Sequence, residues 1–434
     1  MPRPVKYTVG SSKREVYKPA QQSCPPQEAL PRYYYVQPLQ NTPSAWQGAQ
    51  TYADFEVPAQ TGVMTEATLR FQLAFTNNGE SVTAPPLPAT PFWVDHIEVY
   101  IGSDLIETVW KHDIWNEELA FRPYQSLGNV AVPEIGGAAS SYASYNAQID
   151  GAMPSTDTLA LNSSGNAYWF LNMPTCMRSA KPYVRGFQSR IRFRVYFPTS
   201  LVIGVAASWQ TVSLNEVIMI VEEAQTDAGT IAELERAHRQ STVDYTVLVR
   251  NRVQQTFASG QISSGNDIQI YLRGFKNKSA GVIVYNTSAD AFNQGSSATM
   301  NERYEASVLQ LLDAQNNKIT ERLAIEWLEG YVFPDATGSF SATQFDSTVR
   351  TTVIFPFSAD FKTTIQKGCS YGGFRFTTLE QLVLNYKGAW NSSTGSAVSP
   401  QGIAGQTGTV VVTATSYDYA HITVSGGRHS FRME

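Results

Sequence analysis

The sequence predicts an all-β protein built from two tandem β-sandwiches that are joined by a short helical linker and carry long loop insertions. The composition favours strands and turns, with 8 Trp, 22 Tyr, 21 Phe, 30 Gly and 22 Pro in 434 residues. Short runs in which apolar and polar residues alternate recur along the chain, which is typical of half-buried strands. The second half repeats this pattern over roughly 190–200 residues, which indicates an internal duplication.

Charge and composition exclude several classes of function. The net charge is −5 and only 16% of residues are charged, so a general nucleic-acid coat is not expected. The longest apolar run, Leu201 to Trp209, is too short to span a bilayer. Three distant cysteines argue against a disulfide framework, and the N-terminus has no apolar signal region. We therefore expect synthesis in a reducing host cytoplasm.

Residues 1–50 are predicted to form an extended, proline-rich, basic N-terminal arm. The density of proline there forbids regular helix or a central strand. The first 20 residues hold a single acid and five basic residues: Arg3, Lys6, Lys13, Arg14 and Lys18. Such an arm on an acidic protein suggests contact with an anionic surface, whether lipid headgroups, nucleic acid or an acidic neighbour. A solvated tail is the alternative.

Residues 51–225 are predicted to form the first sandwich. Its expected strands are Ala67 to Phe75, Val94 to Ile101, Leu105 to Trp110, Ile191 to Phe197 and Val212 to Val221. A stretch rich in Gly, Ala, Ser and Asn, at about 122–168, interrupts them. A loop of this length is usually functional, and we interpret it as a surface projection.

Residues 226–241 are predicted to form the linker helix. Thr230 and Glu233 have the spacing of a capping box, in which each side chain accepts from the other residue's backbone N–H. Good helix formers follow without Gly or Pro.

Residues 242–434 are predicted to form the second sandwich. Its expected strands are Val243 to Val249, Ile268 to Leu272, Gly281 to Tyr285, Val308 to Leu312, Leu323 to Trp327, Val349 to Phe357, Leu382 to Tyr386, Val410 to Ala414 and His421 to Val424. The last strand precedes the turn Gly426-Gly427. Loops at 286–304, 334–347 and 388–408 separate the others.

A search for catalytic and metal-binding motifs predicts no catalytic, cofactor or metal site. No histidine or cysteine pair has zinc-ligand spacing. Gly368 to Gly372 matches G-x-S-x-G around Ser370, but no helix pattern follows, so a glycine-rich turn is favoured over a hydrolase nucleophile. Three pairs of neighbouring titratable residues are interpreted as rim charges or salt links between subunits: His112 with Asp113, Glu117 with Glu118, and Glu222 with Glu223. Trp110, Trp115, Trp169 and Trp209 are interpreted as packing residues rather than a sugar-stacking platform.

Three stretches resemble the double jelly-roll major capsid proteins of tailless icosahedral viruses. They are residues 92–119 (FWVDHIEVYIGSDLIETVWKHDIWNEEL), 212–223 (VSLNEVIMIVEE) and 417–431 (YDYAHITVSGGRHSF). The resemblance implies two jelly rolls in one chain and a homotrimer with six such units, a pseudo-hexameric capsomer that tiles a bacteriophage-like virion shell. It further implies contacts with neighbouring capsomers and with penton or minor capsid proteins.

The same resemblance implies an internal lipid membrane beneath the shell, with the arm 1–50 facing it. No recognition of a specific nucleic-acid sequence is expected. The alternative from the residues alone is a tandem β-sandwich adhesin or lectin that binds carbohydrate through loop aromatics. An enzyme is the least favoured class.

Overall fold

The computed structural model describes residues 31–40, 44–77, 93–114, 117, 166–199, 209–258, 261–262, 266–288, 302–324, 352–358, 361, 364–365, 372–377, 379–391, 396–398 and 409–434. Most of the N-terminal arm, with all five of its singled-out basic residues, lies outside these ranges. So does nearly all of the insertion at 122–168, and so do Ser370 and Trp115.

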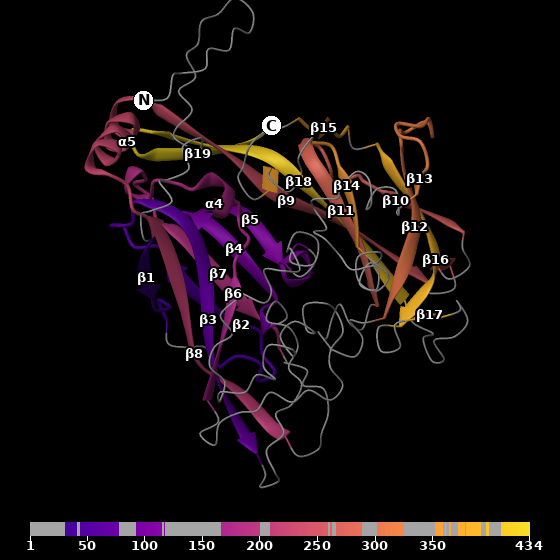
Figure 1. Cartoon of the computed structure of the whole chain (residues 1–434), viewed down its shortest axis with the longest axis horizontal. Helices are drawn as coiled ribbons and strands as arrows, with labels where there is room; N and C mark the ends of the chain where they lie inside the picture. Colours follow the sequence, from indigo (N-terminus) through magenta and orange to yellow (C-terminus); the bar gives the residue numbers. More distant parts are fainter. Residues whose placement is uncertain are drawn as a thin grey trace, which may run out of the picture.

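The described residues of the first half of the chain form a sandwich of eight strands (Figure 1). Its strands are β1 (Arg32–Val36), β2 (Thr51–Glu56), β3 (Val63–Asn77), β4 (His96–Ile101), β5 (Asp104–Trp110), β6 (Asn166–Asn172), β7 (Ile191–Phe197) and β8 (Trp209–Ala224). They form two antiparallel sheets with the orders β1-β8-β3-β6 and β2-β7-β4-β5. This is the connectivity of a jelly roll, in which two Greek keys share two sheets.

The second half repeats that connectivity strand for strand. The equivalent strands are β9 (Thr242–Ala258), β10 (Asp267–Tyr271), β11 (Lys278–Ser288), β12 (Glu302–Leu312), β13 (Leu323–Ala324), β14 (Thr352–Pro356), β16 (Gln381–Asn391) and β18 (Thr409–Ser425). Their sheets run β9-β18-β11-β14 and β10-β16-β12-β13. The predicted duplication is therefore present as topology. Short strands are added at β15 (Phe374–Arg375), β17 (Ser396–Val398) and β19 (Arg428–Met433).

Each sandwich buries an apolar core between its two sheets. In the first, Leu69 and Met219 from one sheet meet Phe193 and Ile97 from the other. In the second, Leu309 and Leu384 face Val284 and Val412. The inward-facing positions alternate along each strand, as the period-two pattern requires.

The long pair β9 and β18 runs through both cores. Val243, Val247 and Ile422 pack in the core of the first sandwich, whereas Phe257 and Val412 pack in that of the second. The two strands pair along their whole lengths, from Thr242 opposite Ser425 to Ala258 opposite Thr409. A continuous ribbon, in addition to the linker, thus connects the two sandwiches (Figure 1).

Helical elements with described bounds cover the first sandwich and its connection to the second. They are α4 (Cys176–Ala180), the 3-10 turn η2 (Val184–Gly186) and α5 (Ala228–Gln240). The linker helix is α5. The predicted capping box of Thr230 and Glu233 is wrong, because the helix begins at Ala228 with Asp227 as its N-cap.

The cap is shifted because a carboxylate precedes the predicted threonine. Asp227 Oδ1 accepts the Thr230 N–H at 2.9 Å, and its Oδ2 accepts the Thr230 hydroxyl at 2.6 Å. Asp is among the strongest N-cap residues and ranks above Thr, so Thr230 becomes the third helical residue instead. The Thr230 contact lowers the pKa of Asp227, which keeps the cap charged.

Several strands differ in extent from their predictions, and two differences change the element order. The two expected strands at 410–414 and 421–424 are one strand, β18, because the residues between them are also buried. Within the segment predicted as an arm, Arg32–Val36 forms the edge strand β1. Prolines at positions 31 and 38 flank it, which suits an edge strand because proline cannot donate to a ladder.

Candidate functional site: a buried charged junction

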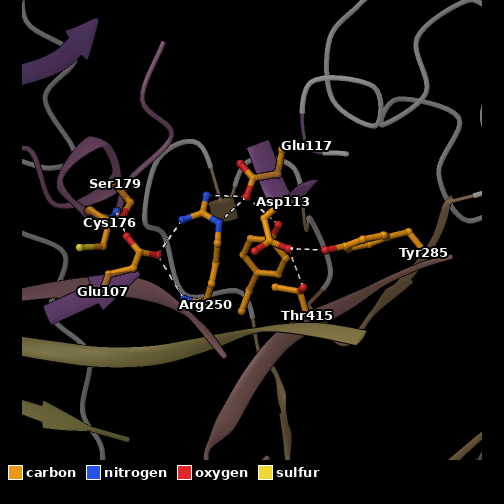
Figure 2. Close-up of polar contacts among 9 residues, drawn as sticks. Glu107, Asp113, Glu117, Cys176, Ser179, Arg250, Tyr285 and Thr415 are labelled. Carbon is orange, nitrogen blue, oxygen red and sulfur yellow. Dashed lines mark hydrogen bonds and ion pairs between the residues drawn. The ribbon is translucent and has the colours of Figure 1, made fainter. Parts of the chain in front are cut away.

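A cluster of charged and hydroxyl side chains lies where the two sandwiches meet (Figure 2). Glu107 on β5 and the helical residues 111–114 that follow it come from the first sandwich, and Glu117 follows them in the chain. Arg250 on β9, Tyr285 on β11 and residues of β18 come from the second. Tyr285 and Tyr417 of the second sandwich belong to a buried cluster on β11 and β18 that is separate from the core between the two sheets.

Arg250 is the centre of the cluster, and its side chain is only 4% exposed. Its Nη1 donates to Glu107 Oε1 at 2.6 Å, and its Nε donates to Glu117 Oε1 at 2.6 Å. Its Nη2 forms a further ion pair with Glu117. The planar guanidinium therefore bridges two carboxylates from the first half of the chain, a geometry that a lysine could not reproduce.

Glu107 extends the junction to helix α4. While Oε1 accepts from Arg250, Oε2 accepts the backbone N–H of Cys176 at 2.6 Å, at the first residue of the helix. The backbone N–H of Arg250 also donates to Glu107, at 3.2 Å. One buried carboxylate thus holds β5, α4 and β9 together.

A second set of contacts surrounds Asp113. Its Oδ1 accepts the Thr415 hydroxyl at 2.7 Å and the Tyr285 hydroxyl at 3.3 Å. The Tyr417 hydroxyl donates to Glu117 at 2.6 Å. Each of these three hydroxyls belongs to the second sandwich and each carboxylate to the first, so every bond crosses between the halves.

Burial controls the ionisation of these groups. It raises the pKa of Glu117, although Arg250 and the Tyr417 hydroxyl act in the opposite direction. Burial alone would lower the pKa of Arg250, but the carboxylates of Glu117 and Glu107 raise it well above its ordinary value. Arg250 is therefore a permanent cation. Burial raises the pKa of the Cys176 thiol, and the negative charge of Glu107 raises it further. This cysteine is therefore a poor nucleophile.

This arrangement is suited to holding two bodies in one orientation. Arg250 pairs with two buried carboxylates from the other half of the chain, and a misaligned arrangement would leave these buried charges unpaired. Among the described residues, no group of three His, Cys, Asp or Glu side chains is placed to hold a metal ion. In the same part of the chain, no helix has the length and hydropathy to cross a bilayer.

The structure corrects the interpretation of the acidic pairs as rim charges. His112, Asp113 and Glu117 are buried, as is Glu223, which accepts from the Tyr34 hydroxyl inside the first sandwich. Trp110 lies beneath the guanidinium of Arg252, which supports a packing role. Gly372, at the end of the G-x-S-x-G match, is followed by strand β15 and not by a helix.

Comparison with known proteins gives structural matches alone. No family model matches the chain, and neither does any curated protein sequence. Among solved structures, VP54 of PBCV-1, fitted into a reconstruction of the virophage Sputnik, superimposes with a TM-score of 0.63 at 10% identity. That match covers 94% of this chain and 97% of VP54.

Two further matches agree. A chain of the PBCV-1 virus capsid gives a TM-score of 0.60 at 10% identity, over 94% of this chain and 97% of that one. A chain of the Sputnik virophage gives 0.50 at 10% identity, over 99% and 94%. The chain has a double jelly-roll fold. The double jelly roll accounts for the repeated sheet order and for the resemblance of the three sequence stretches.

Proposed function

We propose that this double jelly-roll protein is the major capsid protein of an icosahedral virus. The observation that carries the proposal is the duplicated jelly-roll connectivity, which extends over 94% of the chain when it is aligned with a chain of a virus capsid. The buried junction supports it, since a shell tile has to hold its two units at a fixed angle. A structural role, without catalysis, follows.

We further propose that three copies form the pseudo-hexameric capsomer through the two outer faces of the chain. The sheet β1-β8-β3-β6 and the sheet β10-β16-β12-β13 lie toward opposite ends of the molecule (Figure 1). The first face exposes Tyr33 and Tyr35, and the second exposes Tyr271. Contact between unlike faces of identical copies is heterologous, and it closes as a three-membered ring when each copy is rotated by a third of a turn from the last. Tyrosines are enriched at such interfaces.

Light scattering coupled to size-exclusion chromatography tests the trimer. We expect a species of three times the 47.9 kDa chain mass. The double variant Tyr33→Ser/Tyr35→Ser should shift this species toward monomer. The matched control Leu105→Ser, at an exposed apolar residue outside both faces, should not. A monomeric wild type would contradict the proposal, as would equal effects of the two variants.

Capsomers of this kind would contact neighbouring capsomers and penton or minor capsid proteins in the virion. The basic residues Arg3, Lys6, Lys13, Arg14 and Lys18 support a contact between the N-terminal arm and the anionic headgroups of an internal membrane. The capsid chains that match in structure give no support to the alternative of a carbohydrate-binding adhesin.

A further inference from the structure

One buried side chain anchors the linker helix α5 to the rest of the protein. Of its residues Ala228–Gln240, His238 is the one that is buried, at 2% exposed. The helix packs on η2 of the first sandwich and on β9 and β18 of the ribbon. From the last turn of the helix, the His238 ring contacts Gly186 of η2 and the Tyr245 side chain of β9.

The neutral ring satisfies all of the hydrogen bonds around it. Nδ1 lies 2.8 Å from the Leu234 carbonyl oxygen, which can only accept, so Nδ1 carries the proton. Nε2 lies 2.8 Å from the Tyr245 hydroxyl and, in the neutral ring, accepts from it. The same hydroxyl oxygen accepts the Tyr183 backbone N–H at 3.1 Å. A second proton on His238 would leave the Tyr245 hydroxyl hydrogen without its acceptor.

The site has no room to adjust. The ring lies over Gly186, where a Cβ would come within 2.2 Å of His238 Cδ2. The rings of Tyr183 and Tyr245 flank it, with centroids at 5.3 and 6.0 Å. A protonated imidazole in this pocket could not turn toward solvent without moving the helix.

The charged and titratable groups on the surrounding elements do not compensate a positive ring. They are Glu233, Glu235, Arg236 and Arg239 on α5, Tyr183 at the N-cap of η2 and Arg185 within it, Asp244 and Tyr245 on β9, and His421 on β18. Glu235 accepts from the Tyr183 hydroxyl, and Asp244 accepts from Thr423 and contacts His421. In the described part of the chain, no carboxylate forms an ion pair with His238.

We propose that His238 is an acid-sensitive latch that holds the linker helix against both sandwiches at neutral pH and releases it when the ring is protonated. Burial lowers the pKa of His238 from its ordinary value of 6.5. The undocked helix would have the ordinary value. The docked state is therefore fully favoured above pH 6.5, and it weakens as the pH falls toward the lowered pKa, by at most about tenfold per pH unit.

Hydrogen exchange of the α5 amides in the assembled protein, corrected for the intrinsic pH dependence, tests the latch. We expect wild-type protection to fall between pH 7.5 and 5.5. His238→Gln, which cannot titrate, should show no such fall. His421→Gln, a control at a histidine that pairs with Asp244, should keep it.

Tyr245→Phe provides a second test that does not depend on the folding of the glutamine variant. It removes the hydroxyl that His238 accepts from, so protection of α5 at pH 7.5 should drop toward the wild-type value at pH 5.5. Unchanged wild-type protection on acidification would overturn the latch. An equal fall in His238→Gln would overturn it as well.

Discussion

Replacing Arg250 by methionine tests the buried junction. Methionine keeps much of the side-chain volume and removes the cation. Glu107 and Glu117 would then face each other's charge in a buried site without the guanidinium that now bridges them at 2.6 Å on each side. Removing one partner from a buried ion pair costs about 3–5 kcal/mol, because the remaining charge stays desolvated. We expect a loss of that size at pH 7.

The loss should also depend on pH in a defined direction. Burial raises the pKa of Glu117 in the wild type, and the loss of Arg250 removes the main influence that lowers it. A buried acid with a raised pKa contributes most to the free energy of unfolding when it is protonated, at a pH below its ordinary pKa. That contribution is lost as the pH rises through the raised pKa. The deficit of Arg250→Met should therefore shrink when the pH is lowered from 8 to 5.

Urea unfolding followed by tryptophan fluorescence, at one fixed protein concentration, measures this loss. The matched control is Arg322→Met, which breaks a bidentate ion pair with Asp267. The Arg322 side chain is 49% exposed and that of Asp267 is 40% exposed. Exposed pairs contribute about 0–1 kcal/mol. The reasoning is refuted if Arg250→Met costs no more than this control, or if its deficit grows in acid.

Three more predictions concern the remaining contacts. Tyr417→Phe removes a buried donor to Glu117 and should cost about 2 kcal/mol in the same unfolding assay, whereas Ser103→Ala, at an exposed hydroxyl, should cost nothing measurable. Asp227→Ala should increase hydrogen exchange in the first turn of α5, and Glu233→Ala should not; the opposite order would restore the predicted capping box. Deleting residues 1–20 should leave trimers intact and reduce the yield of particles assembled on membrane; a normal yield would argue against a role of the arm.

The strands of both sandwiches could be predicted because each buries one face. Ile191 to Phe197 alternates perfectly in sequence, and it is a strand with those bounds in which every second residue is buried. The same alternation at Val243 to Val249 continues in the structure to Ala258, because β9 leaves one core and enters the other. The alternation of apolar and polar residues within a short stretch does not show that a strand passes from one core to another.

The junction could not be predicted in the same way. Arg250 follows a run of residues that are buried on both faces, Val247, Leu248 and Val249, and a charge in that position is the one sequence signal that it is paired. Its partners lie more than 130 positions away, so only the fold brings them together. In a strand, neighbouring side chains point to opposite faces, so the sequence favours rim charges around residue 113, whereas residues 111–114 are helical.

An electron cryo-microscopy reconstruction of the purified, assembled protein tests the central claim most directly. A threefold particle of pseudo-hexagonal outline is expected, with the outer sheet that carries Tyr33 and Tyr35 on one copy against the outer sheet that carries Tyr271 on the next. A monomer, or a twofold dimer that joins like faces, would contradict the account.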